Sequence, residues 1–171
     1  MTEEITGVLR PRTKRLWLLK YGDRAHCDAA TSQGDRFELG YEGVGRKRIY
    51  YVRDHRGAVL ALSRRMYTTG WRSYSNDSLQ FLDGASGLVI AEYSGPILPT
   101  QLRVGDVPVP CRRYLRKWFR PVYCSEYFEF ESRASRTEVA FVIKRPQFLV
   151  ASLCCGYLDF VLQSEAAASG G

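Results

Sequence analysis

The sequence predicts a mainly β protein, built as a single closed barrel or sandwich of antiparallel hairpins with one buried hydrophobic helix near the C-terminus. Segments rich in β-branched and aromatic residues alternate with turns containing Gly and Asp through most of the chain. A final run, residues 148–162, is apolar on nearly every side of a helix. The length of 171 residues suits one domain. We assign this domain to residues 1–163 and expect a flexible tail at 164–171.

Near the start of the chain the indications of secondary structure are weak, and they become regular from about residue 37. In order, the expected segments are a loose start (1–10), a short strand (16–20), a polar loop (21–35) and strands at 37–41, 48–53 and 58–62. Asp54 and Gly57 begin and end the four residues between the last two strands, which is typical of a type I turn. These two strands are therefore expected to form a hairpin.

The middle of the chain continues this pattern until prolines interrupt it. Further strands are expected at 71–74, 79–82 and 88–93, with a Gly-rich turn at 83–87. Four prolines lie between residues 94 and 110. Because proline has no N–H to donate, we expect a connector there, with one short edge strand at 102–104. One or two helical turns are expected at 112–119, before Pro121.

A second hairpin is expected from residues 123–131 and 137–144. Alternation along its first strand places Phe128 and Phe130 on one face, and Tyr127, Glu129 and Glu131 on the other. The apolar run that follows is too short to span a bilayer and contains Asp159. We interpret it as a helix enclosed in the core; two further strands joined near Gly156 are the alternative.

Positive charge is concentrated in one segment. The chain has 25 Lys and Arg against 18 Asp and Glu, and twenty of the basic residues are Arg, which makes forked contacts with phosphate and carboxylate. Residues 46–72 hold eight basic residues and one acid, so this segment accounts for the net charge of +7. Smaller basic segments lie at 10–15 and 112–120. They indicate either a surface for an anionic partner or ion pairs with acids such as those at 126–131.

The candidate anion-binding residues are chosen on charge alone. They are Arg46, Lys47, Arg48, Arg64, Arg65 and Arg72. Glycines at 40, 43 and 45 precede the first three, and backbone amides beside cations would suit an anion nest. A hairpin turn on a basic edge explains the same glycines.

No motif predicts catalysis. His26, Cys27 and Asp28 are adjacent, but neighbours on an extended chain point to opposite faces, so adjacency does not make a catalytic pair. His55 lies at an expected turn. The five cysteines lack the spacing of a zinc site. We therefore expect a protein that is not an enzyme and that uses no metal or cofactor.

Three segments have a recognisable arrangement: residues 51–65 (YVRDHRGAVLALSRR), 71–74 (WRSY) and 81–92 (FLDGASGLVIAE). Followed by the apolar run, they resemble the tubby C-terminal-like superfamily, most closely its LURP-one-related and scramblase-like branches, over about residues 37–162. The resemblance implies a barrel around a hydrophobic C-terminal helix, and binding of phosphoinositide headgroups on a basic surface. Residues 94–124 depart from the pattern, and no individual lipid-binding residue is carried over.

The sequence thus predicts a non-catalytic binding domain with an Arg-rich face for an anionic partner, and a phosphoinositide-bearing membrane is the favoured partner. An RNA- or DNA-binding accessory protein, for example a viral one, is one alternative. A module that binds host proteins is another. No apolar run has the length of a transmembrane segment, and residues 1–15 lack the apolar core of a signal peptide. We expect a cytoplasmic location, peripheral at a membrane, or a nuclear one.

Overall fold

One curved antiparallel sheet and one C-terminal helix make up the fold. The computed structural model describes residues 3–12, 26–43, 47–66, 78–94, 101–104, 107–116, 120–133 and 138–169. The strands are β1 (Ile5–Pro11), β2 (Cys27–Thr31), β3 (Arg36–Glu42), β4 (Ile49–Asp54), β5 (Val59–Met66), β6 (Ser78–Asp83), β7 (Val89–Ser94), β8 (Gln101–Val104), β9 (Val107–Val109), β10 (Arg112–Arg116), β11 (Arg120–Cys124), β12 (Phe128–Ser132) and β13 (Val139–Ile143). A 3-10 turn, η5 (Pro146–Phe148), leads into α1 (Leu149–Ser169).

Each strand pairs with its neighbours in sequence, with one exception. The thirteen strands follow the order β10-β11-β12-β13-β1-β2-β3-β4-β5-β6-β7-β8-β9. Because β13 pairs with β1, the order is circular but for a seam between β9 and β10. Pro108 and Pro110 lie at this seam, and neither has an N–H to donate to a neighbouring strand. The sheet is therefore open at the seam, and the expected closed barrel is not confirmed.

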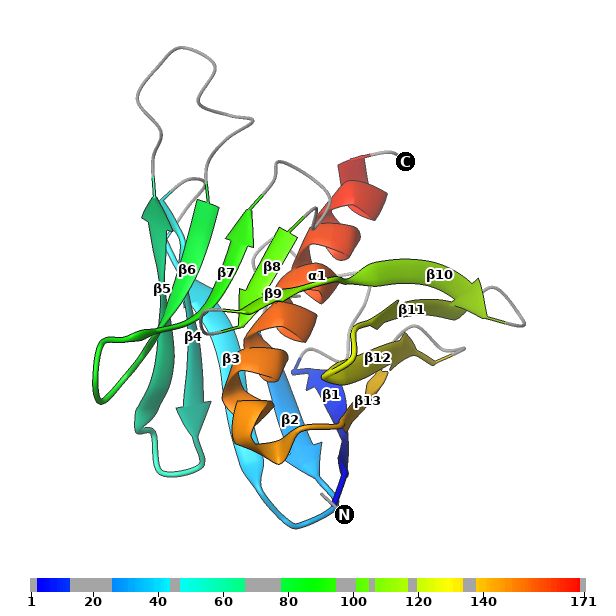
Figure 1. The fold of residues 1–171 in the computed structure, drawn as a ribbon, viewed down its shortest axis with the longest axis horizontal. Coiled ribbons are helices and arrows are strands. Elements are labelled where there is room, and N and C mark those ends of the chain that lie inside the picture. The colour runs from blue at the N-terminus through cyan, green and yellow to red at the C-terminus, as the bar shows by residue number, and fades with distance from the viewer. Residues whose placement is uncertain are drawn as a thin grey trace.

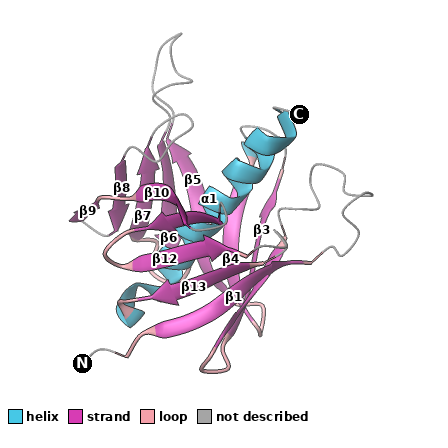
Figure 2. Ribbon diagram, turned by 90° about the vertical axis from the view of Figure 1, so that its right-hand side faces the viewer, coloured by secondary structure: helices cyan, strands magenta, loops and turns pink. Residues whose placement is uncertain are grey.

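The sheet bends around α1. Figures 1 and 2 show the helix running within the curve of the sheet; in Figure 1, β5–β7 lie on one side of the helix and β10–β13 on the other. Every residue from 151 to 158 is buried, although these residues cover all sides of the helix. This confirms the interpretation of the apolar run as an enclosed helix, and excludes the alternative of two strands. The helix also continues to Ser169, into the segment expected to be a flexible tail.

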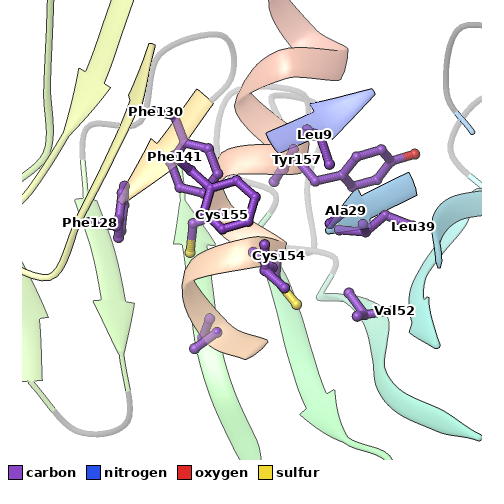
Figure 3. Close-up of a cluster of buried hydrophobic side chains, with 14 of the residues drawn as sticks. Leu9, Ala29, Leu39, Val52, Phe128, Phe130, Phe141, Cys154, Cys155 and Tyr157 are labelled. Carbon is purple, nitrogen blue, oxygen red and sulfur yellow. The ribbon is translucent and has the colours of Figure 1, made fainter. Parts of the chain in front are cut away.

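Side chains from opposite parts of the sheet meet on α1. In Figure 3, Phe130 and Phe141 lie on the side of Cys155, whereas Leu39 and Val52 lie beyond Cys154. Gly156 is needed in this packing because the Phe130 ring lies against the helix backbone. A Cβ at this position would come within 2.2 Å of Phe130 Cζ.

The hairpins expected on either side of residues 54–57 and 83–87 are confirmed. β4 pairs with β5 and β6 with β7. The Asp54 carboxylate accepts hydrogen bonds from two backbone N–H groups of its turn, and the Asp83 carboxylate accepts one from the N–H of Ser86. Gly57 and Gly87 adopt positive φ angles, 83° and 72°, which L-residues with a Cβ rarely adopt.

The predictions for the start of the chain were wrong where the structure describes it. β1 lies in the middle of the sheet between β13 and β2, in place of a loose start. Its inward positions are Ile5, Gly7 and Leu9, and the Phe141 ring fills the space that Gly7 leaves. β2 lies within the expected polar loop, and its inward residues are small, which weakens the strand pattern. The strand expected at 16–20 lies outside the described residues.

The segment after the prolines also differs from expectation. Residues 112–116 form β10 in place of the expected helical turns, and β11 contains Pro121, opposite Leu115. Pairing of β11 with β12 outweighs the local preference, because it buries Val122 and Tyr123. In the connector, β8 includes the edge strand expected at 102–104, and β9 adds a second short strand. The strand expected at 71–74 lies outside the described residues.

Two alanine substitutions in α1 are expected to have opposite effects. Gly156→Ala should destabilise the protein by about 1–3 kcal/mol, because the new methyl group meets Phe130. One turn earlier, the Ser152 hydroxyl is buried and has no hydrogen-bond partner among the described residues. Ser152→Ala should therefore stabilise the protein by about 1 kcal/mol. Denaturant unfolding measures both changes; stabilisation by Gly156→Ala, as helix propensity alone favours, would contradict this packing.

Candidate anion-binding site

Four of the six candidate residues lie at one end of the sheet. Lys47 and Arg48 immediately precede β4, and Arg64 and Arg65 lie near the end of β5. Tyr51 pairs with Leu62 in antiparallel register, so the start of β4 and the end of β5 are adjacent. This end is the upper one in Figure 1, where the C-terminal end of α1 also lies. Arg46 and Arg72 lie outside the described residues.

The described side chains at this end point in different directions. Lys47 is exposed, and the Arg48 guanidinium lies over the Tyr41 ring, 4.3 Å from its centroid. Arg64 is exposed on the outer face of the sheet, where its Nη2 donates to Gln80 Oε1 at 2.8 Å. Lys47 and Arg64 therefore present their charges to solvent, whereas the Arg48 side chain also packs on the end of the core.

In the two smaller basic segments, Arg10, Arg12 and Arg116 form ion pairs with carboxylates. In the segment at 112–120, Arg116 binds Glu129 at 2.9 Å and Glu131 at 2.8 Å, so the expected pairing with the acids at 126–131 is confirmed for this residue. In the segment at 10–15, Arg10 binds Glu138 at 2.8 Å, and Arg12 binds Asp28 at 2.9 Å and Glu38 at 3.2 Å. The hydrogen bond with Asp28 is the main factor that raises the pKa of Arg12.

The basic segment at 46–72 contains cations that no carboxylate of the described residues neutralises. Arg53 has a carboxylate partner, Glu42, at 3.6 Å. Asp54 is the segment's one acid, and its carboxylate is occupied by the backbone of its own turn. Among the described residues, neither Lys47 nor Arg64 has a carboxylate within ion-pair distance. This end of the sheet therefore carries positive charge that the described part of the chain does not neutralise.

A cluster of polar side chains on the outer face connects β3, β4 and the residue before β2. The distribution of charge in the sequence did not predict this cluster. Tyr51 is only 4% exposed, and its hydroxyl oxygen lies 3.3 Å from His26 Nδ1 and 3.4 Å from Glu38 Oε1. Burial and the nearby Glu38 carboxylate raise the pKa of Tyr51. Gly40, paired with Tyr51, makes room for the phenol, since a Cβ there would lie 2.6 Å from the hydroxyl oxygen. The pairing of Gly40 with Tyr51 is recognisable only once the register is known.

Gly40 and Gly43, the described glycines before the basic residues, belong to a hairpin. Glu42 pairs with Ile49, and Gly43 begins the connection with a φ of 91°. A Cβ at Gly43 would lie 2.7 Å from the Lys47 carbonyl oxygen. The described residues thus fit the hairpin turn, and Gly45 lies outside them.

His26, Cys27 and Asp28 are divided between the two faces of the sheet. Cys27 is completely buried in the core, where desolvation, with a smaller effect of Asp28, raises its pKa to about 12. Asp28 is exposed and bound to Arg12. His55 is exposed at the tip of the β4–β5 turn. In the described ranges, no three His, Cys, Asp or Glu residues lie close enough together to hold a metal ion.

Comparisons of this chain with protein-family models, curated proteins and solved structures find no match. Within the described residues, no helix is long and apolar enough to cross a membrane.

The thiols are expected to react selectively. Burial holds the Cys27 thiol protonated at neutral pH, and Cys154 is also fully buried with a raised pKa. Cys111 is half-buried, at the seam between β9 and β10. Brief iodoacetamide treatment of the native protein should therefore alkylate Cys111 well before Cys27 or Cys154, as measured by peptide mass spectrometry. Equal rates at Cys111 and Cys27 would contradict the placement of Cys27, provided that denatured protein is alkylated at every site.

The same burial makes stability depend on alkaline pH. The folded state holds the Cys27 proton up to a pKa of about 12, whereas an exposed thiol loses it at a pKa of about 8.5. Between these values the unfolded state binds fewer protons, so the free energy of unfolding should fall as pH rises. Cys27→Ala should reduce this slope when unfolding is measured at several pH values from 8 upward. An unchanged slope would show that Cys27 does not contribute.

Proposed function

We propose that this protein is a non-catalytic binding domain that uses the end of the sheet around Lys47 and Arg64 to bind an anionic partner, with a phosphoinositide-bearing membrane surface favoured. The observation that carries the proposal is the difference between basic segments. Described cations at 10–12 and Arg116 are held by carboxylates, whereas Lys47 and Arg64 are exposed and have no carboxylate partner within the described part of the chain. Exposed, unpaired cations attract an anion without first breaking an internal ion pair.

The arrangement of charge also suits a partner with several phosphates. Cations approach this end from two chain segments, one before β4 and one at the end of β5. In the sequence, Arg46 precedes Lys47, and Arg72 follows β5 by six residues. Arg makes forked hydrogen bonds with phosphate, and Lys provides a point charge. Cations drawn from separate segments favour a multiply charged headgroup over a single carboxylate.

The resemblance to the tubby C-terminal-like superfamily supports the same choice of partner. That resemblance implies a barrel around a hydrophobic C-terminal helix; the sheet found here also surrounds such a helix, but it is not closed. The resemblance also implies headgroup binding on a basic surface. Residues 51–65, which carry much of the resemblance, include most of β5.

Reversing two charges should abolish most of the binding. In Lys47→Glu/Arg64→Glu, each change removes an attraction and adds a repulsion of about 1 kcal/mol at an anionic surface. Affinity for vesicles that contain a phosphatidylinositol bisphosphate should fall by roughly two to three orders of magnitude. Flotation of the protein with vesicles at physiological salt measures the change, and labelled RNA is titrated in parallel.

The matched control reverses two exposed arginines at the opposite end of the sheet. Arg36→Glu/Arg56→Glu makes the same change in net charge, at the start of β3 and in the β4–β5 turn. It should retain much more vesicle binding than the first variant. Equal losses in the two variants would reduce the effect to net charge and overturn the proposed site. Binding to RNA alone, or to neither ligand, would overturn the choice of a membrane partner.

A further inference from the structure

Two large aliphatic side chains are exposed beside the proposed anion site. Ile49 is 50% exposed at the start of β4, and Leu62 is 40% exposed in β5. Both lie on the outer face of the sheet, since Tyr50, Val52 and Ser63 between or beside them are buried on the inner face.

The register makes these residues one continuous patch. Leu62 pairs with Tyr51 on one side and with Leu82 of β6 on the other. Ile49 lies two residues before Tyr51, and therefore diagonally across from Leu62 on the same face. Arg64 continues this face of β5, and Lys47 precedes Ile49. The patch formed by Ile49 and Leu62 thus adjoins Lys47 and Arg64, neither of which has a carboxylate partner among the residues that the structure describes.

We infer that the protein docks on an anionic bilayer with this outer face of β4 and β5, and that Ile49 and Leu62 enter the interface among the lipid headgroups. The inference rests on the proposed anion site and adds to it an apolar contact and an orientation of the protein on the membrane. Cations beside exposed aliphatic residues are complementary to a bilayer surface, which presents negative headgroups above hydrocarbon.

The same residues fit a nucleic acid less well. Binding to single strands depends on exposed aromatic rings on which bases stack. The aromatic residue of this patch, Tyr51, is 4% exposed, and the Arg53 guanidinium covers its ring at 4.1 Å from the centroid. The exposed side chains are aliphatic, and they contribute to binding where hydrocarbon is available.

Two measurements on the full chain test this inference, with phosphatidylcholine vesicles that contain phosphatidylserine or a phosphatidylinositol bisphosphate. Ile49→Thr/Leu62→Thr keeps side chains that suit a strand but removes much of the apolar surface. It should weaken vesicle binding by about tenfold and leave binding of soluble inositol phosphate unchanged. Leu88→Thr is the control, because Leu88 is 70% exposed at the β6–β7 turn, at the other end of the sheet. It should bind like the unsubstituted protein.

A direct measurement locates the face in the bilayer. Tryptophan at position 62 (Leu62→Trp) should be quenched by brominated lipid chains more than the native tryptophans alone, and Leu88→Trp should add no quenching. Equal quenching at the two positions, with vesicle binding lost in Lys47→Glu/Arg64→Glu, would overturn the apolar contact and leave the anion site standing. If the unsubstituted protein binds soluble inositol phosphate but no vesicle, the docking inference and the choice of a membrane partner both fail, and the anion site stands. If it binds neither, both proposals fail.

Discussion

A helix that is apolar on all sides is the constraint on which this structure depends. Residues 151–158 have no side of α1 that suits water, so the sheet has to enclose the helix to remove it from solvent. A meander of thirteen antiparallel strands does so, with β13 paired to β1 and the remaining gap at a proline-containing seam. Gly156 and Phe130 show how close the enclosure is, since the ring packs directly on the helix backbone.

The proposed site follows from this enclosure. Wrapping the helix assigns the inner faces of strands such as β4 and β5 to the core and leaves their outer faces and the ends of the sheet for other contacts. Antiparallel pairing brings the start of β4 and the end of β5 together, so that cations distant in sequence become neighbours. Ion pairs elsewhere on the outer face, such as Arg12 with Asp28, hold cations of the other basic segments, whereas Lys47 and Arg64 are exposed and have no carboxylate partner among the described residues.

Much of this fold could be predicted from local patterns, and the rest depends on partners distant in sequence. The turns at Asp54 and Asp83 were recognisable because each carboxylate bonds to its own turn. β1 was not, because the middle one of its inward positions is Gly7 and the side chain that fills the space belongs to β13. For the site, the basic segments could be located in the sequence, but not the carboxylates that bind to them. The partner of Arg10, for example, is 128 residues away. The exposure of Ile49 and Leu62 could likewise be recognised only once the register of β4 and β5 was known.

The claim that the start of β4 and the end of β5 form the binding face is tested most directly by hydrogen exchange of the protein on vesicles that contain a phosphatidylinositol bisphosphate. Amides at 47–51 and 62–66 should exchange more slowly on the vesicle than in solution, and those in the turns at 54–58 and 83–88 should not change. Protection of the two turns, with no change at 47–51 and 62–66, would show that the protein binds with its opposite end and would contradict the proposed site.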